Sequence, residues 1–502
     1  MSHHRMRAAW RDAVRLGKRR AETFDLYCDY KNGNDAWAGT YDAPLKTITH
    51  ALTHIGANQK IGLFGDSSDI DTYFREDGLT CATNGVTIKN VAGHTPVWVE
   101  STTLTVWAKT LGRANVYEAS WAGIPQTGAA NGATVLDPAT DVANCDATSN
   151  SFYMDEVAHI LYVNIGGAAP TAIEATKTLT WLMTVSGNNV RVDGLTLQWM
   201  FPPFWLTGTG CIVQNCTMRY QIRERTSAHL FIRVTGHDAQ ILDTNIIQRY
   251  APRSAVELIE IMAASDNCLV DRCILYGGGG NALGSGVELN GTNAIVRNCV
   301  LDGNYYGVKV MGVGSGSIYK NTITDWVSIG IFLEDTATGT VNIYKNTMYL
   351  EHEAGGKTAI QIHGRPTVNV YHNTGYRLDH GGSNSGRFIS VVPTADGMTE
   401  RAKNNAMYIS RYGITWTNIG FAEPTWDMDY NGFYQMATSD FLNVHAADQG
   451  THNVTGVDPL YTGAPNYDLT LAPASPYIGA GVNIPGISEQ NPATIGRYEY
   501  AP

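Results

Sequence analysis

One short pattern recurs through the middle of the chain and restricts the fold more than any other feature. Each copy joins two apolar stretches through a polar residue, with 22 to 32 residues between successive polar residues. The copies are VRVDGLTL (190–197), IVQNCTM (212–218), ILDTNII (241–247), LVDRCIL (269–275), IVRNCVL (295–301), IYKNTIT (318–324), IYKNTMY (343–349), VYHNTGY (370–376) and the weaker AKNNAMY (402–408). Such a period is typical of repeat proteins, in which each unit packs only on its neighbours. One continuous domain can therefore extend over most of the 502 residues.

A second apolar segment follows most copies of the pattern. These segments are LFIRVTG (230–236), VELIEIM (256–262), GVELNG (286–291), GVKVMG (307–312), GIFLED (330–335), AIQIHG (359–364) and FISVV (388–392). Apolar alternation bounded by Gly, Asn and Asp predicts short strands and turns rather than helices. Two or three strands in each unit of roughly 25 residues, at a rise of about 3.3 Å per residue, predict an all-β parallel β-helix.

Polar residues at the fourth position of the pattern align in one column. Its members are Asp193, Asn215, Thr244, Arg272, Asn298, Asn321, Asn346, Asn373 and Asn405 or its neighbour. We interpret this column as structural, because Asn tolerates left-handed backbone at tight turns and stacked amides hydrogen-bond along a solenoid. Cys216, Cys273 and Cys299 occupy equivalent positions and are expected to fill the core. The eight cysteines include no CxxC pair, which favours a reducing compartment, while their even number leaves disulfides open.

Three segments outside the repeat resemble parts of right-handed parallel β-helix proteins, the pectate-lyase-like superfamily. The segment YCDYKNGNDAWAGTYDAPLKTITHAL (27–52) is similar to their opening, and SFYMDEVAHILYVNI (151–165) to the paired strands before their coils. The ending, VDPLYTGAPNYDLTLAPASPYIGAG (457–481) with IGRYEY (495–500), is similar to their terminal coils and final strand. The resemblance implies the fold and a short helix within residues 44–54. It does not select a function, because polysaccharide lyases, glycosidases, epimerases and phage tailspikes share the fold.

The sequence is divided on this basis into four parts. They are a basic N-terminal helix (1–22), an N-terminal cap with the first coils (23–185), regular coils (186–420), and C-terminal coils with a capping strand (421–502). Residues 1–22 have no apolar core of a signal peptide, and Met6, Trp10, Ala13 and Gly17 fall on one side of a helix with Arg on the other faces. We interpret this segment either as a partly ordered, solvated helix or as an anchor that attaches the chain to a larger particle. This plan resembles phage tailspikes, which are made in the host cytoplasm and carried on the virion.

The charge distribution limits the partners. The first twenty residues carry a net charge of +6 within a chain of −11, so the remaining residues carry −17. An acidic body argues against nucleic acid as the main ligand, because a phosphate backbone requires an extended basic surface. The sequence also has no run of 18 apolar residues that would predict a membrane span.

Polar side chains in the second segments predict a catalytic column. Strand side chains alternate, so residues between inward apolar neighbours point outward, one per coil and about 4.8 Å apart. The column is Arg233, Glu260, Glu288, Lys309, Phe332 and Gln361, with Glu257 as the alternative to Glu260. Lys309 as base and Arg233 as acid-neutralising group would suit a lyase, whereas Glu260 and Glu288 would suit a hydrolase. Ordinary cross-strand ion pairs are the structural alternative.

Aromatic and basic residues beside this column predict sugar contacts. The candidates are Trp199, Phe201, Trp205, Tyr305, Tyr306, His363 and Arg365. Pro202 and Pro203 place the first three in a loop rather than a central strand, and a hydrophobic lid is the alternative role for that loop. His352, His363, Arg365, Asp379 and His380 gather in two successive coils.

No cofactor or metal is predicted with any specific motif. Asp29, Asn34 and Asp35 offer oxygen ligands for calcium around a Gly turn, but their spacing does not match an EF-hand and an Asx-turn explains the same residues.

The leading hypothesis is a virion-attached, tailspike-like protein that binds, and on one alternative also cleaves, host-surface polysaccharide. A free, extracellular polysaccharide lyase or glycoside hydrolase is the second hypothesis, and a structural virion protein without a ligand is the third. Association as a homotrimer stays open.

Overall fold

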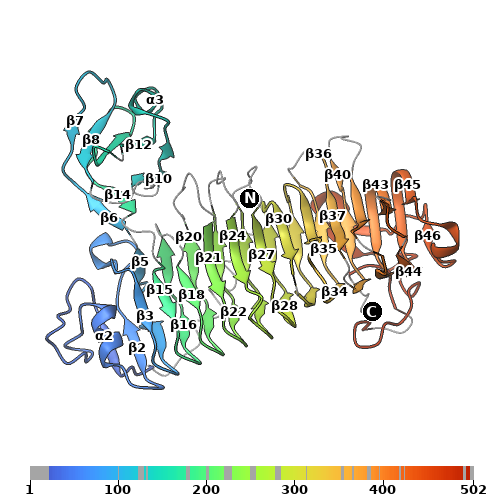
Figure 1. The fold of residues 1–502 in the computed structure, drawn as a ribbon, viewed down its shortest axis with the longest axis horizontal. Helices are drawn as coiled ribbons and strands as arrows, with labels where there is room; N and C mark the ends of the chain where they lie inside the picture. The colour runs from blue at the N-terminus through green and yellow to red at the C-terminus, as the bar shows by residue number, and fades with distance from the viewer. Residues whose placement is uncertain are drawn as a thin grey trace.

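The chain winds into a long solenoid of parallel strands (Figure 1). It is seen here in a computed structural model. The residues described are 22–99, 101–121, 129–131, 134–155, 157–176, 181–198, 203–219, 229–248, 256–277, 284–312, 314–351, 355–364, 367–380, 386–394, 396–417, 420–422, 424–489 and 493–497. The predicted N-terminal helix therefore lies outside them, apart from Glu22. Within them the α-helices are α2 (Ile48–His54) and α3 (Val142–Ala147), neither long enough to cross a membrane.

Each regular coil contributes one strand to each of three parallel sheets. The first sheet contains β1 (Leu26–Cys28), β2 (Lys60–Leu63), β4 (Thr87–Asn90), β16 (Arg191–Asp193), β19 (Ile212–Gln214), β22 (Gln240–Leu242), β25 (Leu269–Asp271), β28 (Ala294–Arg297), β31 (Gly316–Tyr319), β34 (Thr340–Tyr344), β38 (Thr367–Tyr371), β42 (Thr399–Lys403) and β44 (Thr425–Asp429). Every pairing within it is parallel, so the predicted parallel β-helix is confirmed.

The second and third sheets follow in the same coils. The second contains β5 (Val97–Val99), β17 (Thr196–Gln198), β20 (Thr217–Arg219), β23 (Asn245–Ile247), β26 (Ile274–Tyr276), β29 (Val300–Asp302), β32 (Thr322–Thr324), β35 (Thr347–Tyr349) and β39 (Thr374–Tyr376). The third contains β3 (Leu79–Cys81), β15 (Met183–Val185), β18 (Phe204–Leu206), β21 (His229–Val234), β24 (Val256–Ile261), β27 (Ser285–Leu289), β30 (Tyr306–Val310), β33 (Ile329–Leu333), β37 (Thr358–Gly364) and β41 (Arg387–Pro393). The long strands β43 (Ala406–Trp416) and β45 (Gly432–Leu442) extend across both sheets.

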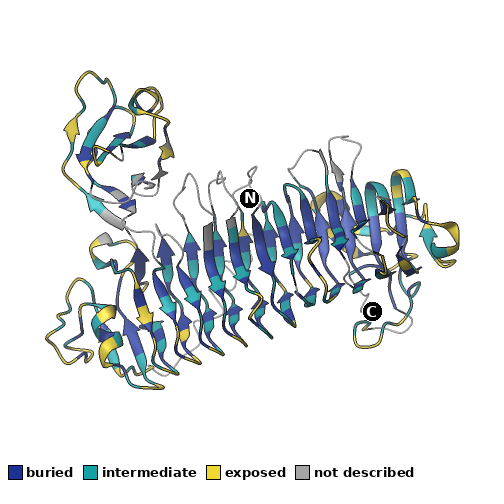
Figure 2. Cartoon of the chain, viewed as in Figure 1, coloured by how far each residue is buried: buried dark blue, intermediate teal, exposed yellow. Residues whose placement is uncertain are grey.

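The interior is apolar because alternate residues of all three sheets point inward. Ile232, Ile259, Val287 and Val308 lie in one such row of the third sheet and are fully buried. Figure 2 shows this burial running along the length of the solenoid. All eight cysteines are buried and unpaired, as core filler requires.

The predicted polar column lies at the corner between the first and second sheets, where its members do not occupy equivalent positions. That column combined three different positions of the turn. Asp193 ends its strand, whereas Asn215, Arg272 and Asn298 have positive φ angles of 53° to 56°. Lys320 has a φ of 57° although the pattern placed Asn321 in its column, so Asn is not needed at the left-handed position.

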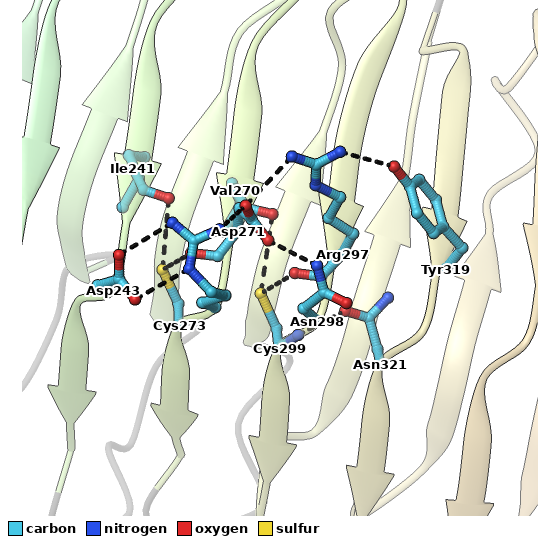
Figure 3. A network of polar contacts seen from close by, with 11 residues as sticks. Ile241, Asp243, Val270, Asp271, Cys273, Arg297, Asn298, Cys299, Tyr319 and Asn321 are labelled. Carbon is cyan, nitrogen blue, oxygen red and sulfur yellow. Dashed lines mark hydrogen bonds and ion pairs between the residues drawn. The ribbon is translucent and has the colours of Figure 1, made fainter. Parts of the chain in front are cut away.

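The position after the left-handed residue forms a buried amide ladder. Each Asn donates its side-chain N–H to the side-chain oxygen of the Asn in the next coil, at 3.0 Å in every step. The ladder runs through Asn321, Asn346, Asn373, Asn405 and Asn431. Thr244 occupies the same position in an earlier coil, as do Cys273 and Cys299 (Figure 3). The predicted stacking of amides is therefore confirmed for part of the column.

Charged residues cover the outside of this corner in the middle coils. Arg272 pairs with Asp243 at 2.9 Å and also with Asp271, which is buried. Asp271 accepts further bonds from Arg297 at 3.2 Å and from Asn298 at 2.8 Å (Figure 3). A buried carboxylate is tolerated here because three neighbouring donors compensate its charge.

A small domain is inserted between β5 and β15. Its antiparallel strands are β6 (Ser101–Leu104), β7 (Ala108–Lys109), β8 (Tyr117–Ser120), β9 (Ala129–Asn131), β10 (Thr134–Val135), β12 (Ser151–Asp155), β13 (Ile160–Asn164) and β14 (Ile173–Thr176), with β11 (Asp137–Pro138) parallel to β12. It has its own core around Trp121 and Phe152, and it stands off one end of the solenoid (Figure 1). The predicted paired strands of residues 151–165 are confirmed, but they belong to this insertion rather than to a cap.

The predicted short helix within residues 44–54 is confirmed, whereas the predicted C-terminal strand is not. The predicted short helix near residue 50 is α2, where the Thr47 hydroxyl caps the helix by accepting from His50 N at 3.1 Å. The predicted final strand is wrong for Ile495–Arg497, which form bends, and residues 498–500 lie outside the described part. Arg497 instead donates to Thr347 Oγ1 at 2.8 Å and to Asn321 O at 3.1 Å, bridging two coils from outside.

Candidate functional site

The outer face of the third sheet carries the predicted column in the predicted register. Arg233 pairs with Glu260, Glu260 with Glu288, and Glu288 with Lys309 on successive strands. The column continues through Phe332 and Gln361. Trp205 precedes Arg233 and lies on strand β18, so its predicted place in a loop is wrong. We call this row and the side chains touching it the third-sheet strip.

The N-terminal part of the strip joins a cation to two indole rings. Arg233 Nε donates to Glu260 Oε2 at 2.6 Å, and its guanidinium lies over the Trp181 ring at 5.7 Å. Trp205 lies 5.8 Å from Trp181 between ring centroids, and its N–H donates to Thr235 Oγ1 at 3.1 Å. The ion pair holds Glu260 in one orientation beside an aromatic surface.

The centre of the strip is a lysine held by two carboxylates. Lys309 Nζ lies 3.7 Å from Glu288 Oε2 and 3.3 Å from Glu334 Oε1, and the Lys309 side chain is 14% exposed. Burial raises the pKa of Glu288, and the charge of Lys309 opposes that rise. The second oxygen of Glu334 is buried and makes no hydrogen bond. A buried acceptor without a donor is uncommon and can mark a place where the hydroxyl group of a ligand or a water donates.

Glu257 is the most perturbed carboxyl of the strip. Leu258 and Ile259 are both buried, so the strand departs from strict alternation and Glu257 joins Glu260 on the outer side. Burial, and after it the charges of Glu288 and Glu260, raise the pKa of Glu257 to about 7 against the opposing charge of Lys309. General acid catalysis uses such a pairing, in which a carboxyl group with a pKa near 7 lies beside ionised carboxylates.

The C-terminal part of the strip is aromatic. Tyr306 stacks on Phe332 at 5.0 Å, and Tyr305 meets Tyr306 edge-on at 4.8 Å. His363 meets Phe332 edge-on at 5.2 Å. The Tyr305 and Tyr306 pair therefore adjoins Lys309 as predicted, and its rings extend the polar centre with an apolar surface.

His363 is bound on both ring nitrogens. Nδ1 lies 2.7 Å from Asp335 Oδ1, and Nε2 lies 2.6 Å from Gln361 Nε2. Gln361 can only donate through that nitrogen, so the neutral ring carries its proton on Nδ1 and donates to Asp335. This arrangement orients His363 and leaves it without a free lone pair for proton abstraction.

Several predicted residues lie outside the described part of the chain. They are Trp199, Phe201 and Arg365, together with His352. His380 lies on β40 (Asp379–His380), which pairs with β36 (Gly355–Gly356).

Sequence reasoning missed three residues of the strip. Glu334 and Asp335 close the segment GIFLED (330–335) that supplied Phe332, but they follow the strand that ends at Leu333, so strand alternation did not place them. Trp181 lies before the first coil copy and shows no signal in the repeat pattern.

The turn proposed for calcium uses its oxygens internally. Asp35 accepts from the N–H groups of Lys46 and Thr47 at 2.9 Å each, and Asn34 accepts from Ala36 N at 2.9 Å. Asp29 accepts from Lys31 N and Asn32 N, as in an Asx-turn. The described residues contain no group of three His, Cys, Asp or Glu side chains able to hold a metal.

Comparison with known proteins bears on the fold. The family model described as "Right handed beta helix region" matches residues 183–387, which contain the strip from β15 to the start of β41. The fold is a right-handed parallel β-helix. The structure of XylC with xylose is similar to this β-helix, with 11% sequence identity, 86% of each chain covered and a TM-score of 0.59.

Other solved structures show the same broad similarity. Pectate lyase Pel9A has 12% identity, covers 95% of this β-helix chain and 96% of its own, and has a TM-score of 0.46. The Dettilon tailspike protein has 10% identity, with 79% and 64% covered and a TM-score of 0.37. No curated protein sequence matches the chain.

Proposed function

We propose that the third-sheet strip binds a neutral polysaccharide and hydrolyses it, with Glu257 as general acid and Glu288 as the second carboxylate. The observation that carries this proposal is the row of ionisable side chains on successive strands, in which Glu260 and Glu288 are direct cross-strand neighbours. Burial beside this row raises the pKa of Glu257 to about 7. A strip of parallel rungs about 4.8 Å apart also matches an extended polymer better than a small molecule.

The charge balance of the strip favours a neutral substrate. Its two cations, Arg233 and Lys309, are each engaged by carboxylates at 2.6 to 3.7 Å. Glu260, Glu288, Glu334 and Asp335 outnumber these two cations among the described residues even with Glu257 protonated, so a polyanionic chain would meet net repulsion. Uronic-acid polymers, which a lyase requires, are therefore the less favoured class.

The chemistry follows from two carboxyl groups in different states. Protonated Glu257 donates its proton to the glycosidic oxygen as the bond from that oxygen to the anomeric carbon breaks. Ionised Glu288 either attacks the anomeric carbon or removes a proton from the attacking water. Either route adds one water across the bond, and Glu257 regains a proton by the end of the cycle. Arg233 and Lys309 then act as positioning residues for Glu260 and Glu288.

The lyase alternative requires Lys309 to accept a proton. An ammonium held by Glu288 and Glu334 has no lone pair to do so, and Arg233 is committed to Glu260. The lyase hypothesis is therefore weaker than the hydrolase hypothesis.

Attachment to a phage particle remains part of the proposal on sequence grounds alone, since residues 1–21 lie outside the described structure. Removing residues 1–22 should leave a folded β-helix that no longer joins its assembly partner. Loss of folding in that truncated chain would mean that the segment caps the solenoid instead.

Substrate panels test the enzymatic proposal. The full chain is incubated with neutral and uronic-acid polysaccharides, and new reducing ends are measured together with ultraviolet absorbance of unsaturated products. Reducing ends without absorbance, on a neutral polymer, support hydrolysis. Absorbance on a uronic polymer would overturn it in favour of a lyase, and no cleavage of any polymer bound by the strip would leave a binding protein.

A further inference from the structure

A hollow lies at the N-terminal end of the β-helix, where three successive coils turn away from the first sheet. It is formed by the segment after β1, by Phe64 after β2 and by His94 after β4. Its volume is about 400 Å³, and a neighbouring hollow of about 330 Å³ shares Asp29, Asn32, Phe64 and His94 with it. Figure 1 shows β2 and α2 at this end of the solenoid.

The floor and walls of the hollow are aromatic. Phe64 is the nearly buried floor, and Tyr41 and His94 meet it edge-on at 5.3 Å and 4.8 Å. Tyr27 stacks against Phe64 at 5.6 Å. Tyr41 is 59% exposed and Trp37, which also lines the hollow, is 44% exposed. Two such rings left in solvent beside one cavity are an uncommon use of large apolar side chains.

Backbone contacts fix this aromatic frame. Tyr27 N donates to Gly39 O at 2.8 Å, and Phe64 N donates to Cys28 O at 2.9 Å. Gly39 has a φ of 73°, which lets the loop carrying Trp37 and Tyr41 turn back over the first strand. The hollow is therefore built into the fold rather than formed by loose side chains.

The remaining lining is polar and acidic. Asp29 holds Asn32 in place by accepting from its backbone N–H at 3.0 Å and its side-chain N–H at 3.0 Å. Asp42 lines the same hollow, and Asp66, Thr72 and Thr95 line the neighbouring hollow. The side chains lining both hollows include no Lys or Arg within the described structure.

We infer that this hollow is a second saccharide site, which binds one or two units of a neutral glycan. Apolar ring faces suit the C–H face of a sugar, and carboxylate, amide and hydroxyl oxygens suit its hydroxyl donors. The absence of a basic lining residue disfavours uronic acids and phosphates. The site follows first-sheet strands whereas the strip lies on the third sheet, so it is separate from the proposed catalytic residues and can hold a chain that the strip does not cut.

The test measures saturation-transfer NMR from the full chain to cellobiose, maltose, lactose and N,N′-diacetylchitobiose, and to tetramethylammonium as a cationic probe. We expect transfer to the C–H protons of at least one disaccharide. Trp37→Ala or Tyr41→Ala should weaken that binding about tenfold, equal to about 1.4 kcal/mol. Tyr276→Ala is the matched control, because Tyr276 is a 41% exposed tyrosine on the second sheet.

The outcomes separate this site from the strip. Glu257→Gln should abolish cleavage and leave the binding that depends on Trp37 unchanged, so each proposal can fail alone. Three results would overturn the inference: no transfer to any disaccharide, equal transfer in wild type and Trp37→Ala, or binding only of tetramethylammonium, which would identify an aromatic cage for organic cations.

Discussion

Glu257→Gln should change how the stability of the protein depends on pH. Raising the pKa of this carboxyl from 4.5 to about 7 makes its ionised form less favourable in the folded state by about 3 kcal/mol. Below about pH 4.5 the group is protonated in both folded and unfolded chains, so its contribution to stability is complete. That contribution is lost as pH rises through about 7, because only the unfolded chain ionises freely.

Glutamine carries no charge at any pH and removes this dependence. The free energy of unfolding of the variant, relative to that of wild type, should therefore rise by about 3 kcal/mol between pH 4.5 and pH 8.5. Denaturant unfolding at a series of pH values measures the difference, and the comparison cancels the contributions of other groups. Glu118→Gln, in the inserted domain, is the matched control and should follow wild type. A difference between Glu257→Gln and wild type that stays constant with pH would refute the buried, acidic environment of Glu257.

Three further substitutions test other parts of the structure. Glu400 is 2% exposed, its two carboxyl oxygens make no hydrogen bond, and burial raises its pKa well above 4.5. Glu400→Met should therefore raise the free energy of unfolding at neutral pH by about 1–3 kcal/mol. A destabilised variant would contradict this expectation. Asn346→Ala should lower the free energy of unfolding by about 3 kcal/mol, because it leaves the backbone N–H of Asn321 and the carbonyl of Ile318 without their side-chain partners. An effect within about 0.5 kcal/mol, as is usual for surface substitutions, would mean that the ladder is not cooperative. Lys309→Met removes the charge that opposes the raised pKa of Glu288, so the acidic limb of the pH–rate profile should move to higher pH, and an unmoved limb would exclude Glu288 from the ionised role.

The strip was predictable because it follows from simple alternation. Arg233, Glu288 and Lys309 each stand between two apolar residues of one short strand, so their outward direction and cross-coil register follow from a period of two. Glu257 was identified only as a substitute for Glu260. Glu257 lies on the outer side together with Glu260 because Leu258 and Ile259 both turn inward. This arrangement breaks the two-residue alternation of the strand, and packing between coils determines it.

The polar column was partly wrong for a related reason. A turn with two adjacent, non-equivalent positions gives no unique alignment when either position can hold Asn. Lys320 and Lys345 adopt left-handed backbone without a sequence signal, and both side chains pair with Glu489 of the returning C-terminal segment. The sequence analysis did not separate the inserted domain from the first coils, because its antiparallel strands carry no copy of the repeat. No local sequence signal marks where the chain leaves one coil and returns to the next.

The most direct test of the account is the rate of glycosidic cleavage by Glu257→Gln on a neutral polysaccharide that wild type degrades. Loss of the general acid should lower kcat by about 10²–10⁴-fold, while Glu118→Gln keeps the wild-type rate. The wild-type rate should also fall as pH rises through about 7, because ionised Glu257 has no proton to donate. Full activity of Glu257→Gln with an unchanged pH profile would contradict the assignment of catalysis to the third-sheet strip.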